Sequence, residues 1–250
     1  MRQARAQGMA AKVRVLKPPA ERRRELIDCA QGMFLSRGYE RTTINDVIMA
    51  TGLSKGAFYH YFRSKEDLLE AIAARFAGQA LGFVAELQAG RDALGSLNLI
   101  LAVGREWKLE HMGELRAMFT TLLKPENAVL YTRIVEAVFA VMTPALVAII
   151  ERGQGEGAFA AGDAQVAAET LLWLSNGRRP LVIAALEAAE TDPDAALAMI
   201  VRRVRAEETI IDRILGLPPG SVQLIGSVDE LSALMLAWRR EAGAAEAEAG

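Results

Sequence analysis

Three helix-start signals are crowded into one short segment of the sequence, TTINDVIMATGLSKGAFYHYFRSKEDLL, which spans residues 42–69. Thr43, Ser54 and Ser64 are each suited to cap a helix, and the first and third are followed three residues later by an aspartate, as in a capping box. Gly52 stands where the first of these helices should end. Because such signals leave no room for long loops, they predict a compact helical unit with a tight turn between two of its helices.

Helical periodicity covers most of the remaining chain, and no stretch is rich in strand-forming residues apart from the ambiguous SVQLIGSV at 221–228. The fold class is therefore predicted to be all-α. A proline near the middle of one helix, Pro144, predicts a kink, and Arg178-Arg179-Pro180 interrupts another helix. The predicted helices are 21–37, 44–51, 54–61, 65–88, 92–111, 113–123, 125–152, 164–189, 193–215 and 229–241.

Composition narrows the class of protein further. The chain has 250 residues, of which 52% are apolar, enough to bury a sizeable core. Its single cysteine, Cys29, cannot form an internal disulfide, so we expect a cytoplasmic location and an inert buried thiol. The apolar run at 137–150 is shorter than a bilayer-spanning helix, and the N-terminus lacks the pattern of a signal peptide. We therefore expect no membrane partner.

The charges are distributed unevenly, although the net charge is only −2. Residues 1–65 carry thirteen Lys and Arg against five Asp and Glu, whereas residues 66–250 carry sixteen against twenty-six. A basic end on an acidic body indicates that one end meets a polyanion. The alternative is a basic but merely solvated face.

The short helix after Ser54 has more aromatic rings than its buried face can hold. Phe58 and Phe62 lie four residues apart and are predicted to pack on the neighbouring helices. Tyr59 and Tyr61 are predicted to point outward, and the small residues before them let the helix tip approach a surface closely. These are the properties of a recognition helix in a DNA major groove. The alternative is that both tyrosines pack on neighbouring helices.

From about Arg22 to Arg75 the sequence resembles the helix-turn-helix domain of the tetracycline-repressor (TetR) family of transcriptional regulators, with the motif itself at about 43–62. The resemblance includes the Thr-Thr pair, the Gly-Leu-Ser turn, the aromatic recognition helix and Ser-Lys-Glu. It implies that Thr43 and Lys65 contact phosphates. It also implies that five residues face the major groove: Lys55, Gly56, Ala57, Tyr59 and Tyr61. Ser54 and His60 would lie at the margin of the groove.

The resemblance also implies a domain plan: a DNA-binding domain at 21–75 and a helical effector-binding and dimerisation domain at 76–241. The low-complexity sequence at 242–250 predicts a disordered tail. Residues 1–20 are predicted to form a flexible basic arm, which contributes to DNA affinity or in part precedes the true start at Met9. Members of the family act as homodimers on palindromic operators and sense small molecules, mostly as repressors. The long helix at 65–88 would act as the lever between effector and DNA.

Bulky, adaptable side chains in the middle helices are candidates for the wall of an effector pocket: Trp107, His111, Met112, Met118, Phe119, Tyr131, Phe139, Met142 and Trp173. The alternative for each of them, which we favour, is plain core. Few charges fall among them, so we expect an apolar or aromatic effector. For the dimer interface we expect Ala167, Thr170, Leu171, Leu174 and Gly177 on one helix and Ile200, Val204, Ile211 and Ile214 on the next.

Other functions find little support in the sequence. There is no His-Glu-x-x-His pattern, no phosphate-binding loop after a strand and no partner base for the one cysteine, so we expect neither an enzyme, nor a metal site, nor a cofactor. The glycine-rich GQGEG at 153–157 joins two helices and is read as a turn. The main alternative is a helical small-molecule-binding or adaptor protein without sequence-specific DNA binding.

Overall fold

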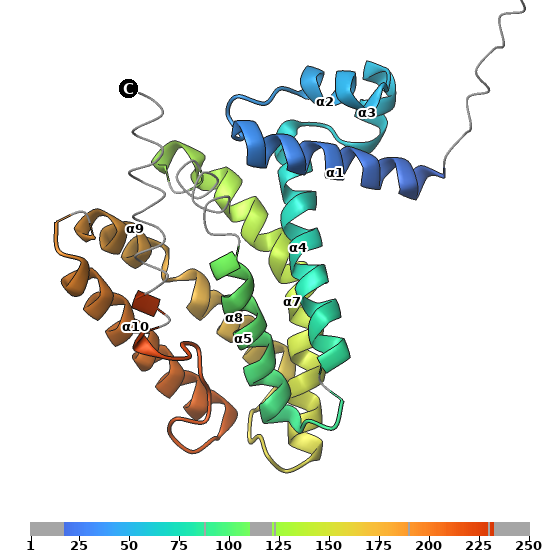
Figure 1. Cartoon of the computed structure of the whole chain (residues 1–250). Coiled ribbons are helices and arrows are strands. Elements are labelled where there is room, and N and C mark those ends of the chain that lie inside the picture. Colours follow the sequence, from blue (N-terminus) through green and yellow to red (C-terminus); the bar gives the residue numbers. More distant parts are fainter. Residues whose placement is uncertain are drawn as a thin grey trace, which may run out of the picture.

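The computed structural model describes residues 18–87, 89–110, 122, 124–189, 191–229 and 231–232, and for 104–110 and 186 it describes the backbone only. Within these residues every regular element is a helix, as the periodicity predicts, and SVQLIGSV is irregular (Figure 1). The elements are α1 (Pro19–Arg37), α2 (Ile44–Thr51), α3 (Lys55–Tyr61), α4 (Lys65–Leu87), α5 (Ala93–Glu110), the 3-10 helix η1 (Pro125–Asn127), α7 (Ala128–Gly155), α8 (Ala164–Asn176), α9 (Arg179–Ala188) and α10 (Pro193–Leu215).

The N-terminal unit consists of α1, α2 and α3 packed around the start of α4 (Figure 1). Its core contains Leu26, Phe34, Val47, Phe58 and Leu68, among other buried residues. Leu122, Leu130 and Ile134 complete the same core. The first turns of α7 are therefore continuous with the N-terminal unit.

A second core lies in the C-terminal body, where α4 runs beside α7 and α5, and α8 and α10 close the other side (Figure 1). It is formed by buried residues such as Leu97, Ile150, Leu171 and Leu215. By length and composition, α4 and the stretch Pro125–Gly155 are each long and apolar enough to cross a membrane. In this fold the buried residues of both helices belong to the two cores.

Several predicted boundaries need correction. The predicted border at residue 20 falls inside α1, which begins at Pro19 because proline fits the first turn of a helix. The predicted helix 164–189 is two helices, since the chain turns at Gly177 and α9 then begins at Arg179, with Pro180 in its first turn. Most of the predicted helices 113–123 and 229–241, and residues 1–17 of the arm, lie outside the described residues. Pro144 lies within α7, which continues to Gly155.

The predicted dimer face is wrong for four of its residues, because α8 and α10 turn them inward. Ala167 and Leu171 on α8, and Val204 and Ile211 on α10, are buried inside the chain. α8 carries apolar residues on its outer side as well, and periodicity alone does not say which of the two sides is covered. The exposed side of these helices carries Thr170, which was predicted, together with Val166, Trp173, Ala206, Thr209 and Ile210.

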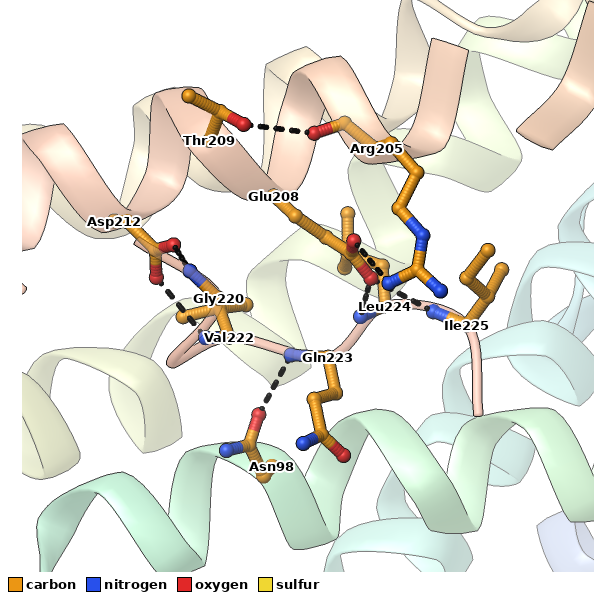
Figure 2. Close-up of polar contacts among 10 residues, drawn as sticks. All are labelled: Asn98, Arg205, Glu208, Thr209, Asp212, Gly220, Val222, Gln223, Leu224 and Ile225. Carbon is orange, nitrogen blue, oxygen red and sulfur yellow. Dashed lines mark hydrogen bonds and ion pairs between the residues drawn. The ribbon is translucent and has the colours of Figure 1, made fainter. Parts of the chain in front are cut away.

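Residues 216–225, here called the strap, fold back along α10 after its C-terminal end. Two carboxylates of α10 hold the strap by its backbone (Figure 2). Asp212 accepts the amides of Gly220 and Val222 at 2.7 and 3.0 Å. Glu208 accepts those of Leu224 and Ile225 at 2.8 and 3.2 Å.

Asn98 of α5 holds the strap from the other side. Its side-chain oxygen accepts the amide of Gln223 at 3.0 Å (Figure 2). Its side-chain nitrogen donates to the carbonyl of Ser221 at 2.9 Å. The strap thereby ties α10 to α5.

Candidate nucleic-acid interface

The first helix of the motif begins with a complete capping box. The Thr43 hydroxyl oxygen accepts the Asp46 amide at 3.2 Å, while the Asp46 carboxylate accepts the Thr43 amide at 2.8 Å. The hydrogen bonds from Thr43 lower the pKa of Asp46. Thr43 is exposed, and the amides of the first turn of α2 lie beside it. Thr43, which is predicted to contact a phosphate, therefore lies at the surface with its side chain held in place by hydrogen bonds.

The turn into α3 follows the predicted chemistry. Gly52 ends α2 in the left-handed conformation, with φ of 65°, which a residue with a side chain rarely adopts. The Ser54 side chain then caps α3 by accepting the Ala57 amide at 3.2 Å. Two helices are thus joined with only Gly52, Leu53 and Ser54 between them.

The aromatic residues of α3 separate into core and surface. Phe58 and Phe62 are buried in the N-terminal core, as predicted. Tyr59 is 44% exposed and lies edge-on to Phe58, with ring centres 5.4 Å apart. Tyr61 is half-buried and packs against the N-terminal core, so the prediction that both tyrosines point outward holds fully only for Tyr59.

The leading end of α3 is open. Lys55 and Gly56 are exposed, Ala57 is half-buried, and His60 is exposed one turn further on. A Cβ added to Gly56 would meet nothing within 4 Å, so the fold itself does not require glycine here. The small residue therefore leaves room outside the protein, where another molecule can approach the backbone.

Lys65 is held at the start of α4 by Tyr39. Its ammonium donates to the Tyr39 carbonyl oxygen at 3.0 Å and lies 4.0 Å from the centre of the Tyr39 ring. The Tyr39 hydroxyl donates to Glu66 at 3.2 Å, and burial together with the negative charge of Glu66 raises the pKa of Tyr39. The phenol therefore stays protonated and keeps this arrangement in place.

One hollow of about 480 Å³ brings these residues together from α2, α3 and α4. Four of the predicted DNA contacts line it, namely Thr43, Lys55, Tyr59 and Lys65. Asn45 and Arg63, which sequence reasoning did not select, also line it. The only sequence feature that could have identified them is their position. Asn45 is in the first turn of α2, and Arg63 lies between the predicted recognition helix and the next helix cap.

The predicted pocket residues are only partly described. Four of them, His111, Met112, Met118 and Phe119, lie outside the described residues, and so does the side chain of Trp107. Phe139 and Trp173 meet edge-to-face with ring centres 5.2 Å apart, which joins α7 to α8. Met142 packs against the C-terminal core.

Tyr131 makes a polar contact between the same helices. Its hydroxyl donates to the Asn176 side chain at 3.0 Å, and the Arg179 guanidinium lies 4.4 Å from the centre of its ring. Nowhere in the part of the chain that the structure describes do three or more His, Cys, Asp or Glu side chains gather as metal ligands would.

Residues 26–72 match the family model described as bacterial regulatory proteins of the tetR family. The N-terminal domain of this chain is therefore a domain of the TetR family. Residues 26–72 accordingly form a TetR-type helix-turn-helix DNA-binding domain, and the family is one of transcription regulators, not of enzymes. This confirms the family, the all-α fold class and the nature of the N-terminal domain.

Curated relatives match over part of the chain. The HTH-type transcriptional repressor KstR2 of Rhodococcus jostii is 34% identical over 97 residues, which is 36% of this chain and 48% of that protein. The repressor AcnR of Corynebacterium glutamicum is 37% identical over 68 residues, or 27% of this chain and 36% of that protein. The chain thus spans about half, or less, of the length of these relatives.

Solved TetR structures share the fold over most of the chain. The R. erythropolis repressor QsdR is 14% identical with a TM-score of 0.57, covering 80% of this chain and 97% of that one. Thermus thermophilus FadR, solved in complex with lauroyl-CoA, is 22% identical with a TM-score of 0.53, covering 75% and 93%. At these identities the likeness shows the fold alone.

Proposed function

We propose that this TetR-family protein is a ligand-responsive transcriptional repressor that binds a palindromic operator as a homodimer and is released from it by a small molecule. The observation that carries the proposal is the hollow between α2, α3 and α4, where Thr43, Lys55, Tyr59 and Lys65 converge. A hydroxyl, two cations and an exposed phenol beside a slim helix tip suit phosphates on either side of a major groove.

The distribution of charge and small residues supports the same function. Residues 1–65 hold an excess of cations on an otherwise acidic chain, as a protein that must stay soluble yet bind DNA requires. Glycine within a helix is destabilising by about 0.5–1 kcal/mol relative to alanine. In the part of the chain that the structure describes, nothing lies within 4 Å of a Cβ added at position 56, so the glycine is better explained by a close approach of DNA to the backbone.

Homodimer formation is supported by the exposed side of α8 and α10. Val166 and Trp173 lie seven residues apart on α8, and Ile210 is exposed on α10, which packs against α8. Large exposed apolar side chains on neighbouring helices mark an interaction surface. A twofold assembly would present two copies of α3 to half-sites about 34–36 Å apart on one face of the duplex.

For the effector we propose an apolar or aromatic small molecule. Phe139, Met142 and Tyr131 are half-buried along α7, and these side chains are suited to an apolar pocket wall. The lauroyl-CoA bound by the structurally similar FadR makes acyl-CoA the first compound to test. Release of a bound operator duplex by lauroyl-CoA, but not by free CoA, would assign the effect to the apolar chain.

The deciding experiment is selection of binding sites from random duplex DNA by the full-length protein. We expect enrichment of an inverted repeat, and affinity for that duplex should fall steeply as salt rises, because several phosphate contacts release counterions. Failure to enrich any sequence, together with weak binding to all duplexes at low salt, would favour the adaptor protein without sequence-specific DNA binding.

A further inference from the structure

One arginine of α7 contacts the first turn of α4. The Arg133 Nη2 atom donates to Asp67 at 2.7 Å, and its Nε lies 2.6 Å from the Glu70 carboxylate. The two acids are three residues apart and therefore lie on one face of α4. We call these three residues the Arg133 clamp.

Asp67 also contacts the turn that follows the recognition helix. Its second carboxylate oxygen accepts the Arg63 amide at 3.0 Å, and its own amide donates to the Ser64 hydroxyl at 3.2 Å. Arg63 and Ser64 form the turn between α3 and α4, directly after Phe62, which ends α3. An unbroken series of contacts thus leads from α7 through Asp67 to the C-terminal end of the recognition helix.

The clamp also balances a concentration of negative charge. Glu66, Asp67 and Glu70 lie within the first two turns of α4. Burial and the neighbouring acids raise the pKa of Glu70, whereas Arg133 opposes this shift. Burial works against ionisation of Asp67 as well, but the hydrogen bonds from the Arg63 amide and from Arg133 leave its pKa lowered. Asp67 is therefore ionised at neutral pH and able to hold both partners.

The contacts on either side of Arg133 are apolar. Leu130 and Ile134 of α7 belong to the N-terminal core and hold the two parts together, but apolar packing is not directional. A guanidinium that binds two carboxylates does fix the orientation of α4 relative to α7, because its hydrogen bonds are directional. Farther along, the same helix carries Phe139 and Met142, two of the candidate pocket residues.

We propose that Arg133 is a positioning residue that holds α3 in its DNA-binding orientation relative to the effector-binding body, through Asp67 and the turn at 62–64. The inference rests on the proposed function, because orientation of α3 matters only if α3 binds DNA. An effector that moves α7 would act on the recognition helix through this clamp.

The test compares Arg133→Gln with Arg152→Gln in the full-length protein. Arg152 lies on the same helix and pairs with Glu156, Asp92 and Ser96, far from the DNA-binding domain. Two readouts are measured: hydrogen–deuterium exchange at residues 60–67 in the free protein, and affinity for the selected operator duplex. Arg133 is 41% exposed, so its substitution should leave the fold intact.

We expect Arg133→Gln to speed exchange at 60–67 and weaken operator binding about tenfold, within the usual range of coupling between sites. Arg152→Gln should change neither. Arg133→Lys, which keeps the charge but not the fork geometry, should fall between wild type and Arg133→Gln. Unchanged exchange at 60–67 in Arg133→Gln would overturn the proposal, and so would wild-type operator affinity.

These results separate the two proposals. If the wild-type protein selects no duplex, the proposed repressor function fails. The exchange experiment needs no DNA, so it still decides whether Arg133 orders the turn at the end of α3.

Discussion

The Lys65 ammonium lies 4.0 Å from the centre of the Tyr39 ring and donates to the carbonyl oxygen of the same residue. Two interactions thus fix a cation at the rim of the hollow, where α4 begins. A side chain already ordered in this way loses little conformational freedom when it meets a phosphate. Lys65 is therefore prepared for a contact with the DNA backbone and carries no information about base sequence.

Replacing Lys65 with alanine should weaken binding to all duplexes by a similar factor. Loss of one phosphate contact reduces the magnitude of the slope of log affinity against log salt by about one. Lys124→Ala, which alters an exposed lysine that does not line the hollow, should leave both affinity and slope unchanged. If the substitution lowered affinity for the selected operator alone and left affinity for other duplexes unchanged, that would contradict a contact to the DNA backbone.

Tyr59 should instead affect the choice of sequence. It is the most exposed aromatic side chain of α3, and its hydroxyl can reach a base edge or a phosphate while the ring can touch a thymine methyl. We expect Tyr59→Ala to change the ranking of a set of mutated operators, measured by competition binding. Tyr59→Phe removes only the hydroxyl, so it distinguishes the contribution of the hydroxyl to binding from that of the ring. The same ranking for Tyr59→Ala and wild type would show that Tyr59 does not read bases.

Local signals explain why the DNA-binding domain could be predicted closely. Thr43, Gly52 and Ser54 act within a few residues of themselves, so a cap or a left-handed turn is visible without the tertiary fold. The burial of Phe58 and Phe62 followed from their spacing in the same way. Family resemblance then supplied the roles that spacing cannot give.

Contacts between distant segments were not visible in this way. Glu208 and Asp212 lie in the charged stretch RRVRAEETIIDR and look like surface residues, yet both are buried because the strap folds over them. The pairing of Arg133 with Asp67 likewise joins two helices far apart in sequence. The outward face of α8 was missed since both of its faces carry apolar residues.

The exposed apolar side of α8 gives a prediction about assembly. Trp173 is 51% exposed, and a buried interface tryptophan typically contributes about 2 kcal/mol or more to binding. Trp173→Glu should therefore shift the protein toward monomer in sedimentation experiments. Phe83→Glu is the matched control, since Phe83 is 50% exposed on α4. If Phe83→Glu dissociates the dimer and Trp173→Glu does not, the interface lies elsewhere.

Replacing the carboxylate with a side-chain amide should affect stability differently at Asp212 and Glu208, the two residues that hold the strap (Figure 2). Asp212 uses one oxygen for Gly220 and the other for Val222, so Asp212→Asn turns an NH2 group toward a backbone N–H. We expect a loss of about 1–3 kcal/mol in the free energy of unfolding, measured by urea denaturation, because a buried donor loses its acceptor.

Glu208→Gln is the control for this change. Glu208 accepts both of its amides on a single oxygen, which the glutamine carbonyl can replace. The substitution loses the ion pair with Arg205, but the Arg205 side chain is 51% exposed, so its guanidinium can be hydrated and no buried donor loses its acceptor. Equal destabilisation by the two variants would argue against the different use of their oxygens.

Two helical glycines should respond in opposite ways to alanine. A Cβ on Gly153 of α7 would overlap the ring of Phe159, which is buried and cannot swing aside, so Gly153→Ala should destabilise the fold by about 1–3 kcal/mol. Gly82 in α4 is exposed with nothing within 4 Å, and Gly82→Ala should stabilise by about 0.5–1 kcal/mol. Thermal or urea unfolding of the two variants measures both effects. Stabilisation by Gly153→Ala would mean that Phe159 packs elsewhere, because helix propensity alone favours alanine at both positions.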